Sequence, residues 1–249
     1  MKFNQDDVSQ VSEDLRRKLL KLYDTYMSAD GREVNYIGLL HDDEFRSYVD
    51  STAELQKVNL GELSGNEMKC FWINIYNSLI VHAITVRGPA KDLLQRLRWF
   101  GDISYVIGGC KFSANDIEHG ILRANAPSPA SFWSIVGLKN CAPPTFSQKD
   151  PRVKFAARKV DPRIHFALNC GASSCPPIKV YSSINLEEQL DAAAEAFCLE
   201  EVQFIEGQNE LLLSSIFKWY GTDFGASKSD LISFLSKYSS QGNLYILID

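Results

Sequence analysis

Hydrophobic residues near the start of the chain recur at three- and four-residue steps, the spacing of one face of an α-helix. They are Val8, Val11, Leu15, Leu19, Leu22, Tyr23 and Tyr26. The opposite face is charged, so residues 8–27 predict an amphipathic helix on the surface. Similar patterns predict further helices over residues 42–55, 91–98, 114–123, 185–198 and 227–237.

Residues 64–86 predict a longer and more hydrophobic helix. Ser64 and Glu67 have the spacing of a capping box, in which each side chain accepts a hydrogen bond from the backbone of the other residue. The Arg87-Gly88-Pro89 sequence is a typical stop signal. The hydrophobic positions cover a wide surface, which predicts a helix inside the core. They include Phe71, Trp72, Ile75, Leu79 and Ile80.

A polar stripe also runs along this helix. Cys70, Asn74, Ser78 and His82 follow one another at four-residue intervals, so their side chains lie along one face. Buried polar side chains of this kind usually satisfy backbone groups of neighbouring loops. The alternative is that the stripe forms one wall of an active-site cleft, and the sequence leaves both interpretations open.

Short stretches rich in β-branched and aromatic residues predict strands. They are a hairpin at residues 104–113 that turns at Gly108-Gly109, a second hairpin at 202–214, the run 164–168 and a closing strand at 244–248. Residues 125–150 are rich in proline and serine and predict a long loop or an insertion. These elements predict one α+β domain, in which a small, mainly antiparallel sheet packs on the central buried helix and further helices surround it.

Residues 161–177 concentrate the groups that could carry out chemistry. His165, Asn169, Cys170 and Cys175 lie in or beside a turn of small residues, which lets a ligand or another backbone approach closely. In a strand, His165 and Cys170 would point to opposite faces. Only the turn can then bring them together, and Cys175 becomes an equal candidate.

Three kinds of site compete here with a packed turn that holds two buried cysteines. A thiol nucleophile would use Cys170 or Cys175 with His165 as its base. A redox site would join the two cysteines in a reversible disulfide across the turn. A metal site would draw on the histidines and cysteines, but their spacing fits no standard zinc motif, so we expect no metal ion. The group that orients the base could be Asn169, Asn74, Asp116 or Glu118.

The predicted helix over residues 114–123 carries a second polar group. Asp116, His119 and Arg123 can share one of its faces. Gly120 weakens such a helix by about 1 kcal/mol relative to alanine. Its presence therefore predicts close packing at that point, with another backbone as one candidate neighbour.

Composition narrows the classes of function. The net charge is −5, so a basic surface for nucleic acid is not expected. The first residues lack the hydrophobic core of a signal peptide, and the longest apolar run, residues 71–86, is too short to span a bilayer comfortably. We therefore expect a cytoplasmic protein without a transmembrane segment. Six cysteines without a C-x-x-C pair then predict mostly reduced thiols.

Four segments together resemble the domain of unknown function 547 family: residues 71–77 with His82, 116–123, 165–177 and 216–224. The resemblance implies a family core over residues 60–225, preceded by a helical extension, residues 1–59. It leaves a C-terminal helix and strand, residues 226–249, that we expect to pack on the core. The residues that match the family's motifs are Asn74, Asn77, His82, Glu118, His119, Arg123, His165, Cys170, Cys175 and Asp223.

The resemblance implies a fold and a site rather than a reaction. Relatives join this domain to glutaredoxin and DEP modules or to coiled-coil segments, and DEP and coiled-coil neighbours are recruitment devices. This favours an intracellular adaptor or interaction module with a protein or peptide partner. The alternatives are a cysteine-dependent hydrolase or acyl transferase of papain-like or transglutaminase-like chemistry, or a thiol redox protein. We expect no cofactor.

The polar motifs all lie within apolar elements, where an unpaired polar group costs roughly 1–3 kcal/mol. We therefore expect them to meet in one cleft, although they are far apart in the sequence. The expected site residues are Asn74, Glu118, His119, His165, Cys170 and Cys175.

Overall fold

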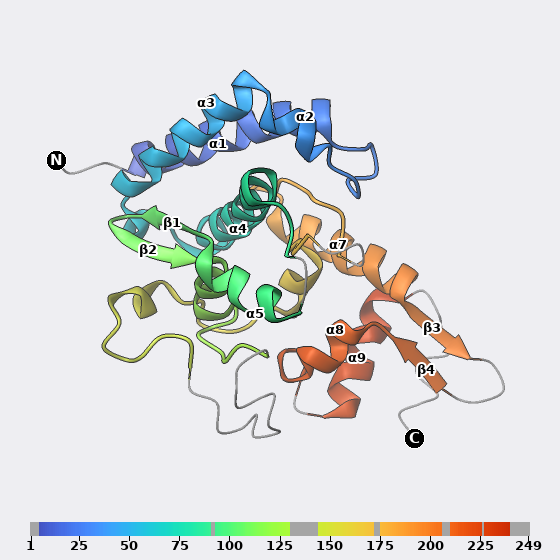
Figure 1. Ribbon diagram of the computed structural model, residues 1–249. Coiled ribbons are helices and arrows are strands. Elements are labelled where there is room, and N and C mark those ends of the chain that lie inside the picture. Colours follow the sequence, from blue (N-terminus) through green and yellow to red (C-terminus); the bar gives the residue numbers. More distant parts are fainter. Residues whose placement is uncertain are drawn as a thin grey trace.

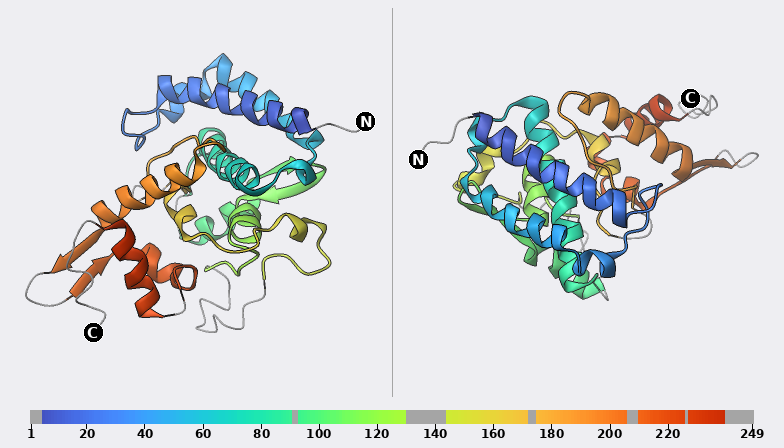
Figure 2. Two further views of the ribbon diagram at one scale, coloured as in Figure 1. Left: turned by 180° about the vertical axis from the view of Figure 1, so that it is seen from behind. Right: turned by 90° about the horizontal axis from the view of Figure 1, so that it is seen from above.

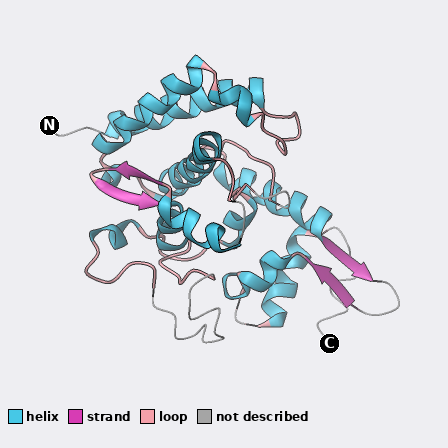
Figure 3. Ribbon diagram, viewed as in Figure 1, coloured by secondary structure: helices cyan, strands magenta, loops and turns pink. Residues whose placement is uncertain are grey.

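The computed structural model describes residues 5–90, 93–129, 144–171, 175–205, 210–225 and 227–239. Helices make up most of it, with two small pairs of strands (Figure 3). In chain order the elements are α1 (Gln5–Tyr26), α2 (Tyr36–Leu40), α3 (Asp43–Ser51), η1 (Thr52–Lys57), η2 (Leu60–Glu62), α4 (Gly65–Arg87), α5 (Leu93–Asp102), β1 (Ser104–Ile107), β2 (Cys110–Ser113), η3 (Asp116–Leu122), η5 (Pro151–Phe155), η6 (Pro162–Phe166), α7 (Leu186–Glu201), β3 (Val202–Ile205), β4 (Glu210–Leu213), α8 (Ser215–Trp219), η7 (Gly221–Asp223) and α9 (Lys228–Tyr238).

Helix α4 lies at the centre of the molecule, as the sequence predicts (Figure 1). The predicted capping box is present, with the Ser64 backbone N–H donating to Glu67 Oε2 over 3.3 Å. Trp72 and Ile73 of this helix are completely buried. Helices α1, α2 and α3 cover one side of α4, the hairpin of β1 and β2 lies beside it (Figures 1 and 2), and η3 packs against it.

Two hydrophobic clusters form the interior. The larger one joins α1, α3 and α4 to β1, β2 and η3, and the smaller one lies among α7, α8 and α9. Helix α7 contributes Leu190 to the first cluster and Ala194 to the second, so it ties them together. The predicted single α+β domain is confirmed. Among the described residues, no helix is both long enough and apolar enough to cross a membrane.

The described strands form two antiparallel pairs rather than one sheet. Strand β1 pairs with β2 through the predicted turn, where Gly108 and Gly109 have φ values of 55° and 77°. Glycine adopts such positive φ values without strain, which suits a two-residue hairpin. Strand β3 pairs with β4 beyond the end of α7. The strand predicted at residues 244–248 lies outside the described residues.

The strand predicted at residues 164–168 is wrong. The segment instead begins with the 3₁₀ helix η6. Asp161 caps this helix by accepting a hydrogen bond from the Arg163 backbone N–H over 3.1 Å, and Pro162 occupies its first position. Proline suits that position because its missing N–H would have had no partner within the helix. The Asp-Pro start therefore outweighs the strand preference of the residues that follow it.

Helix η6 lies between the two hydrophobic clusters. Ile164 packs into the larger cluster and Phe166 into the smaller one. His165, between them in the sequence, is also buried. This anchoring on both sides fixes the histidine in the interior.

The helix predicted over residues 114–123 is present, although most of it, η3, is a π-helix. A Cβ atom on Gly120 would lie 2.3 Å from two ring atoms of Phe146, so the close packing predicted there is against a side chain. Ala124 and Asn125 follow with φ values of 53° and 62°. The Asn125 amide then hydrogen-bonds to the backbone N–H and C=O of Phe146 at 2.6 and 3.0 Å. These bonds tie together two positions within the predicted loop 125–150, of which residues 130–143 lie outside the described part.

Candidate functional site

Three charged or titratable side chains meet in the interior: Arg123 at the C-terminal end of η3, His165 of η6 and Asp223 of η7. Arg123 holds Asp223 with two hydrogen bonds, from Nε to Oδ2 at 2.5 Å and from Nη2 to Oδ1 at 2.9 Å. His165 Nε2 lies 2.8 Å from the same Oδ2. All three side chains are only 2–4% exposed. Burial alone would raise the pKa of Asp223, but the hydrogen bonds from His165 and Arg123 lower it to about 2.

His119 extends this cluster on the other side of Arg123. Its Nδ1 lies 3.1 Å from Arg123 Nη1. Because a guanidinium can only donate, Nδ1 must be the acceptor in this contact. This requires a neutral imidazole that carries its proton on Nε2. Burial lowers the pKa of His119 to about 4, which agrees with that neutral form. Arg123 Nη1 also donates a hydrogen bond to the carbonyl oxygen of Pro127 over 2.8 Å.

Two tyrosines hold the carboxylate of Glu118, the residue before His119. Tyr76 donates to Oε2 over 3.0 Å and Tyr220 donates to Oε1 over 2.6 Å. Burial, with a smaller contribution from the Glu118 charge, raises the pKa of both phenols well above the ordinary value. The tyrosines are therefore protonated donors. The ring of Tyr220 also lies against His165, with 4.0 Å between ring centroids.

The cysteine pair lies next to this buried cluster. The sulfurs of Cys170 and Cys175 are 2.9 Å apart, longer than the roughly 2.05 Å of a disulfide bond. The backbone N–H of Cys170 also donates to the Cys175 sulfur over 3.2 Å. Cys170 follows His165 by five residues on the same segment of the chain.

Two asparagines hold the backbone around the cysteines. Asn77 of α4 donates to the carbonyl of Ala167 and accepts from the N–H of Asn169, both over 2.9 Å. The Asn169 amide in turn bonds to the carbonyl of Pro176 at 2.7 Å and to the N–H of Gly171 at 2.8 Å. The chain on both sides of the turn is thereby fixed to the central helix.

Five of the six expected site residues lie in this region: Glu118, His119, His165, Cys170 and Cys175. The sixth, Asn74, is used elsewhere. Its amide nitrogen donates to the carbonyl of Tyr181, and its oxygen accepts from the Tyr181 N–H, both over 2.8 Å. Cys70 lies against the same carbonyl at 3.3 Å. This part of the polar stripe on α4 therefore satisfies the backbone of a neighbouring loop.

His82, at the other end of the polar stripe on α4, also contacts a neighbouring element of the fold. His82 Nδ1 lies 2.8 Å from the hydroxyl of Tyr105, and burial lowers the pKa of its imidazole. Asp116 does not orient a catalytic base either. Its carboxylate accepts hydrogen bonds from the backbone N–H and the hydroxyl of Ser113 and forms an ion pair with Arg152 at 2.9 Å.

The group that orients His165 is Asp223, which was absent from the expected site although it belongs to a matched motif. Tyr76, Asn77 and Tyr220 were absent as well. Tyr220 and Asp223 lie in the segment 216–224, whose similarity to the family was the one signal that could have drawn attention to them. The contacts themselves join residues 58 and 100 positions apart, so spacing along the chain could not indicate them.

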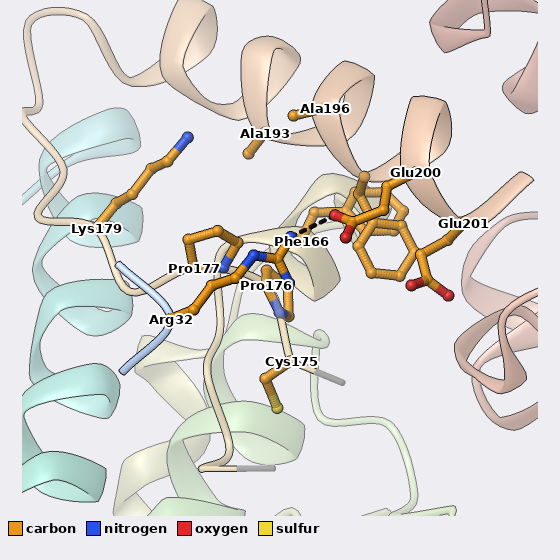
Figure 4. A pocket seen from close by; sticks show the side chains of 11 residues that line it. Arg32, Phe166, Cys175, Pro176, Pro177, Lys179, Ala193, Ala196, Glu200 and Glu201 are labelled. Atoms are coloured by element: carbon orange, nitrogen blue, oxygen red, sulfur yellow. Dashed lines mark hydrogen bonds and ion pairs between the residues drawn. The ribbon is translucent and has the colours of Figure 1, made fainter. Parts of the chain in front are cut away.

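A pocket of about 260 Å³ lies on the other side of Cys175 (Figure 4). Residues 175–177 form one wall and α7 forms another. Arg32, from the turn after α1, reaches Glu200 of α7 in an ion pair of 2.5 Å, drawn as a dashed line in Figure 4. Within the described part of the chain, no group of three or more histidines, cysteines and carboxylates is arranged to hold a metal ion.

Comparison with known proteins gives one match. Residues 60–198 match the model of the family described as "Protein of unknown function, DUF547". Curated proteins and solved structures give no match. The matched residues make up more than half of the chain and include all of α4, η3, η6 and the cysteine pair. This protein therefore belongs to the DUF547 family.

Proposed function

We propose that this protein acts in thiol–disulfide chemistry, with Cys170 and Cys175 as a pair that reversibly forms a disulfide. The observation that supports this most directly is the 2.9 Å distance between the two sulfurs. Closing that distance to the roughly 2.05 Å of a bond needs only a small movement of two side chains. The asparagine contacts that fix the surrounding backbone keep one thiol close to the other, which favours ring closure.

The oxidant in this proposal is an external disulfide of class RS–SR. A cysteine thiolate attacks it, one RS⁻ leaves, and a mixed disulfide forms on the protein. The second cysteine loses its proton and attacks the protein sulfur of that mixed disulfide, which releases the second RS⁻. The two cysteines together lose two electrons, and RS–SR takes them up to become two RSH after protonation.

The hydrolase interpretation has less support. A thiol hydrolase needs an imidazole that can reach both the nucleophile and the substrate. The side chains of His165 and His119 are 2% and 5% exposed, and one nitrogen of each is engaged by Asp223 or Arg123. A substrate carbonyl would reach them only after a rearrangement of the interior.

The adaptor interpretation is the second candidate, and exposed apolar side chains favour it. Ile184, Ile37 and Trp219 are 89%, 76% and 61% exposed. Large apolar residues on a surface suit contact with a protein or peptide partner. If the adaptor role stands alone, replacing either cysteine of the pair leaves partner binding unchanged, whereas Trp219→Ala weakens it.

The redox proposal is tested by equilibrating the protein with mixtures of reduced and oxidised dithiothreitol, followed by acid quenching, alkylation and mass spectrometry. We expect Cys170 and Cys175 to become protected together, in one transition that both Cys170→Ser and Cys175→Ser abolish. Cys110→Ser is the matched control, because this partly exposed cysteine lies on β2, away from the pair.

Cys70 and Cys198 are expected to remain unreactive thiols throughout that measurement. Burial raises the pKa of Cys70 to about 11 and that of Cys198 to about 12, so neither should react in the folded protein. Alkylation of Cys170 and Cys175 that stays complete across the whole series of mixtures would overturn the proposal.

A further inference from the structure

We propose, building on the redox function above, that Cys175 is the sulfur that exchanges with an external disulfide and Cys170 is the sulfur that resolves the mixed disulfide. We further propose that the pocket in Figure 4 receives the disulfide of a small peptide thiol that carries both carboxylate and ammonium groups.

The hydrogen bonds of the pair distinguish the two sulfurs. The backbone N–H of Cys170 points at the Cys175 sulfur, 3.2 Å away. The sulfur–sulfur contact of 2.9 Å can add a second donor when Cys170 carries the proton. A thiolate on Cys175 would thus accept two hydrogen bonds from Cys170, and hydrogen bonds to an ionised form stabilise it. The thiolate is the attacking species in disulfide exchange, so this arrangement selects Cys175.

The surroundings of the two residues point the same way. Asn169, the residue before Cys170, is hydrogen-bonded to Asn77, the neighbour of Tyr76, whose hydroxyl binds the buried carboxylate of Glu118. A second negative charge is unfavourable near such a carboxylate. Cys175 instead lines the pocket, whose charged side chains include as many cations as anions. A proton on Cys170 and a charge on Cys175 is therefore the favoured distribution.

The pocket also indicates what kind of disulfide would enter. Its volume of about 260 Å³ is near the lower end of the roughly 300–1,000 Å³ common for small-molecule sites, so it suits a small ligand or part of one. Its apolar lining comes from residues of η6, α7 and the segment 176–177. Its charged side chains have both signs: Arg32 and Lys179 are cations, and Glu200 and Glu201 are anions.

The charges and the thiol lie at different ends of this pocket. In Figure 4 the Cys175 sulfur points away from the Arg32–Glu200 ion pair. A ligand that joins both ends must therefore be extended, with its sulfur at one end and its charged groups at the other. A short peptide thiol with free carboxylate and ammonium groups has this distribution, which complements the mixed charges of the pocket.

The reaction in this assignment conserves atoms and electrons. The Cys175 thiolate forms an S–S bond to one sulfur of the peptide disulfide, and the other peptide leaves as a thiolate that takes a proton from solvent. Cys170 then attacks the Cys175 sulfur, and the proton of Cys170 passes to the second departing thiolate. The protein gains one disulfide, and the peptide disulfide becomes two thiols.

The assignment of roles is tested by trapping the mixed disulfide with oxidised glutathione as the probe. The Cys170→Ser variant should accumulate one glutathionyl group on Cys175, as measured by mass spectrometry of tryptic peptides. The Cys175→Ser variant should form its adduct on Cys170 at least roughly tenfold more slowly. Equal rates in the two variants, or a faster adduct on Cys170, would overturn the assignment while leaving the dithiothreitol transition of the wild type intact.

The role of the pocket is tested by comparing oxidised glutathione with the uncharged 2-hydroxyethyl disulfide in the Cys170→Ser background. Lys179→Glu should slow the charged probe roughly threefold to tenfold and leave the neutral one unchanged. Lys149→Glu, which reverses the charge of an exposed lysine outside the pocket lining, should change neither rate. If Lys179→Glu slows both probes equally, or neither, the pocket does not recognise the peptide, whatever the outcome for the redox pair.

Discussion

Replacement of Asp223 by asparagine tests whether the buried cluster stabilises the fold as its geometry indicates. The carboxylate accepts hydrogen bonds of 2.5 and 2.9 Å from Arg123 and lies 2.8 Å from His165. Its pKa of about 2, against an ordinary 3.8, corresponds to about 2 kcal/mol in favour of the ionised form in the folded protein. Asp223→Asn removes this contribution and also leaves the Arg123 charge buried without its partner. We therefore expect a total loss of about 3–5 kcal/mol.

The assay is urea unfolding at neutral pH, followed by circular dichroism. Asp43→Asn is the matched control, because the Asp43–Arg46 ion pair is largely exposed and should contribute less than about 1 kcal/mol. Adding Arg123→Met to Asp223→Asn should recover part of the loss, since the double variant no longer buries an unpaired charge. If Asp223→Asn costs no more than Asp43→Asn, or if the double variant is less stable than Asp223→Asn alone, the reasoning is refuted.

The same carboxylate makes a pH-dependent contribution whose sign follows from its pKa. The pKa is lower in the folded protein than in the unfolded chain, so the contribution is complete above about pH 4 and is lost as the pH falls towards 2. The difference in unfolding free energy between the wild type and Asp223→Asn should therefore narrow over that range. A difference that stays constant from pH 5 to pH 2 would show that the charge of Asp223 is not what stabilises the fold.

Three further perturbations test separate contacts. Burial keeps His119 neutral with a pKa of about 4, so the wild type should lose about 3 kcal/mol of stability as the pH falls from 7 to 4, and His119→Asn should lack this dependence in urea titrations at each pH. Gly120→Ala should cost roughly 1–3 kcal/mol, because its Cβ would lie 2.3 Å from the Phe146 ring; adding Phe146→Leu should restore part of the melting temperature. Asn77→Ala should cost roughly 2–5 kcal/mol in urea unfolding, because it leaves two buried backbone groups of residues 167–169 without a partner. The first expectation is contradicted if His119→Asn keeps the pH dependence of the wild type, and the second if Phe146→Leu leaves the melting temperature of Gly120→Ala unchanged. The third is contradicted if Asn77→Ala lowers the free energy of unfolding by less than about 1 kcal/mol.

Sequence reasoning succeeds for the fold where local signals and hydrophobic pattern agree. The capping box at Ser64 and the stop at Gly88 fix the ends of α4, and Gly108-Gly109 fixes the first hairpin. It fails at residues 164–168, where two local signals conflict. The hydrophobic run there favours a strand, but the Asp-Pro pair before it starts a 3₁₀ helix, and burial against two clusters accounts for the apolar residues equally well.

The sequence predicted which polar residues lie together only in part, for a related reason. Polar residues inside apolar elements must find partners, and His119 and His165 do lie in one buried cluster of hydrogen-bonded side chains. The rule does not say which partners they find. Asn74 finds its partners in the backbone N–H and C=O of Tyr181, whereas His165 finds its partner in the carboxylate of Asp223. Choosing between such partners requires the three-dimensional arrangement, because each contact joins segments that are distant in the chain.

Exposure separates the two halves of the region more clearly than residue type does. Arg123, His165 and Asp223 are almost completely buried and are linked by short polar contacts, so they brace the interior where three segments meet. Cys170 and Cys175 are partly exposed and follow His165 by five and ten residues along the same backbone. A dithiol works as a redox pair only if its two sulfurs stay close in the reduced state, and the hydrogen bonds of Asn77 and Asn169 hold the backbone on both sides of the turn. In the redox function proposed above, the buried network would therefore support the backbone on which the two reacting sulfurs lie.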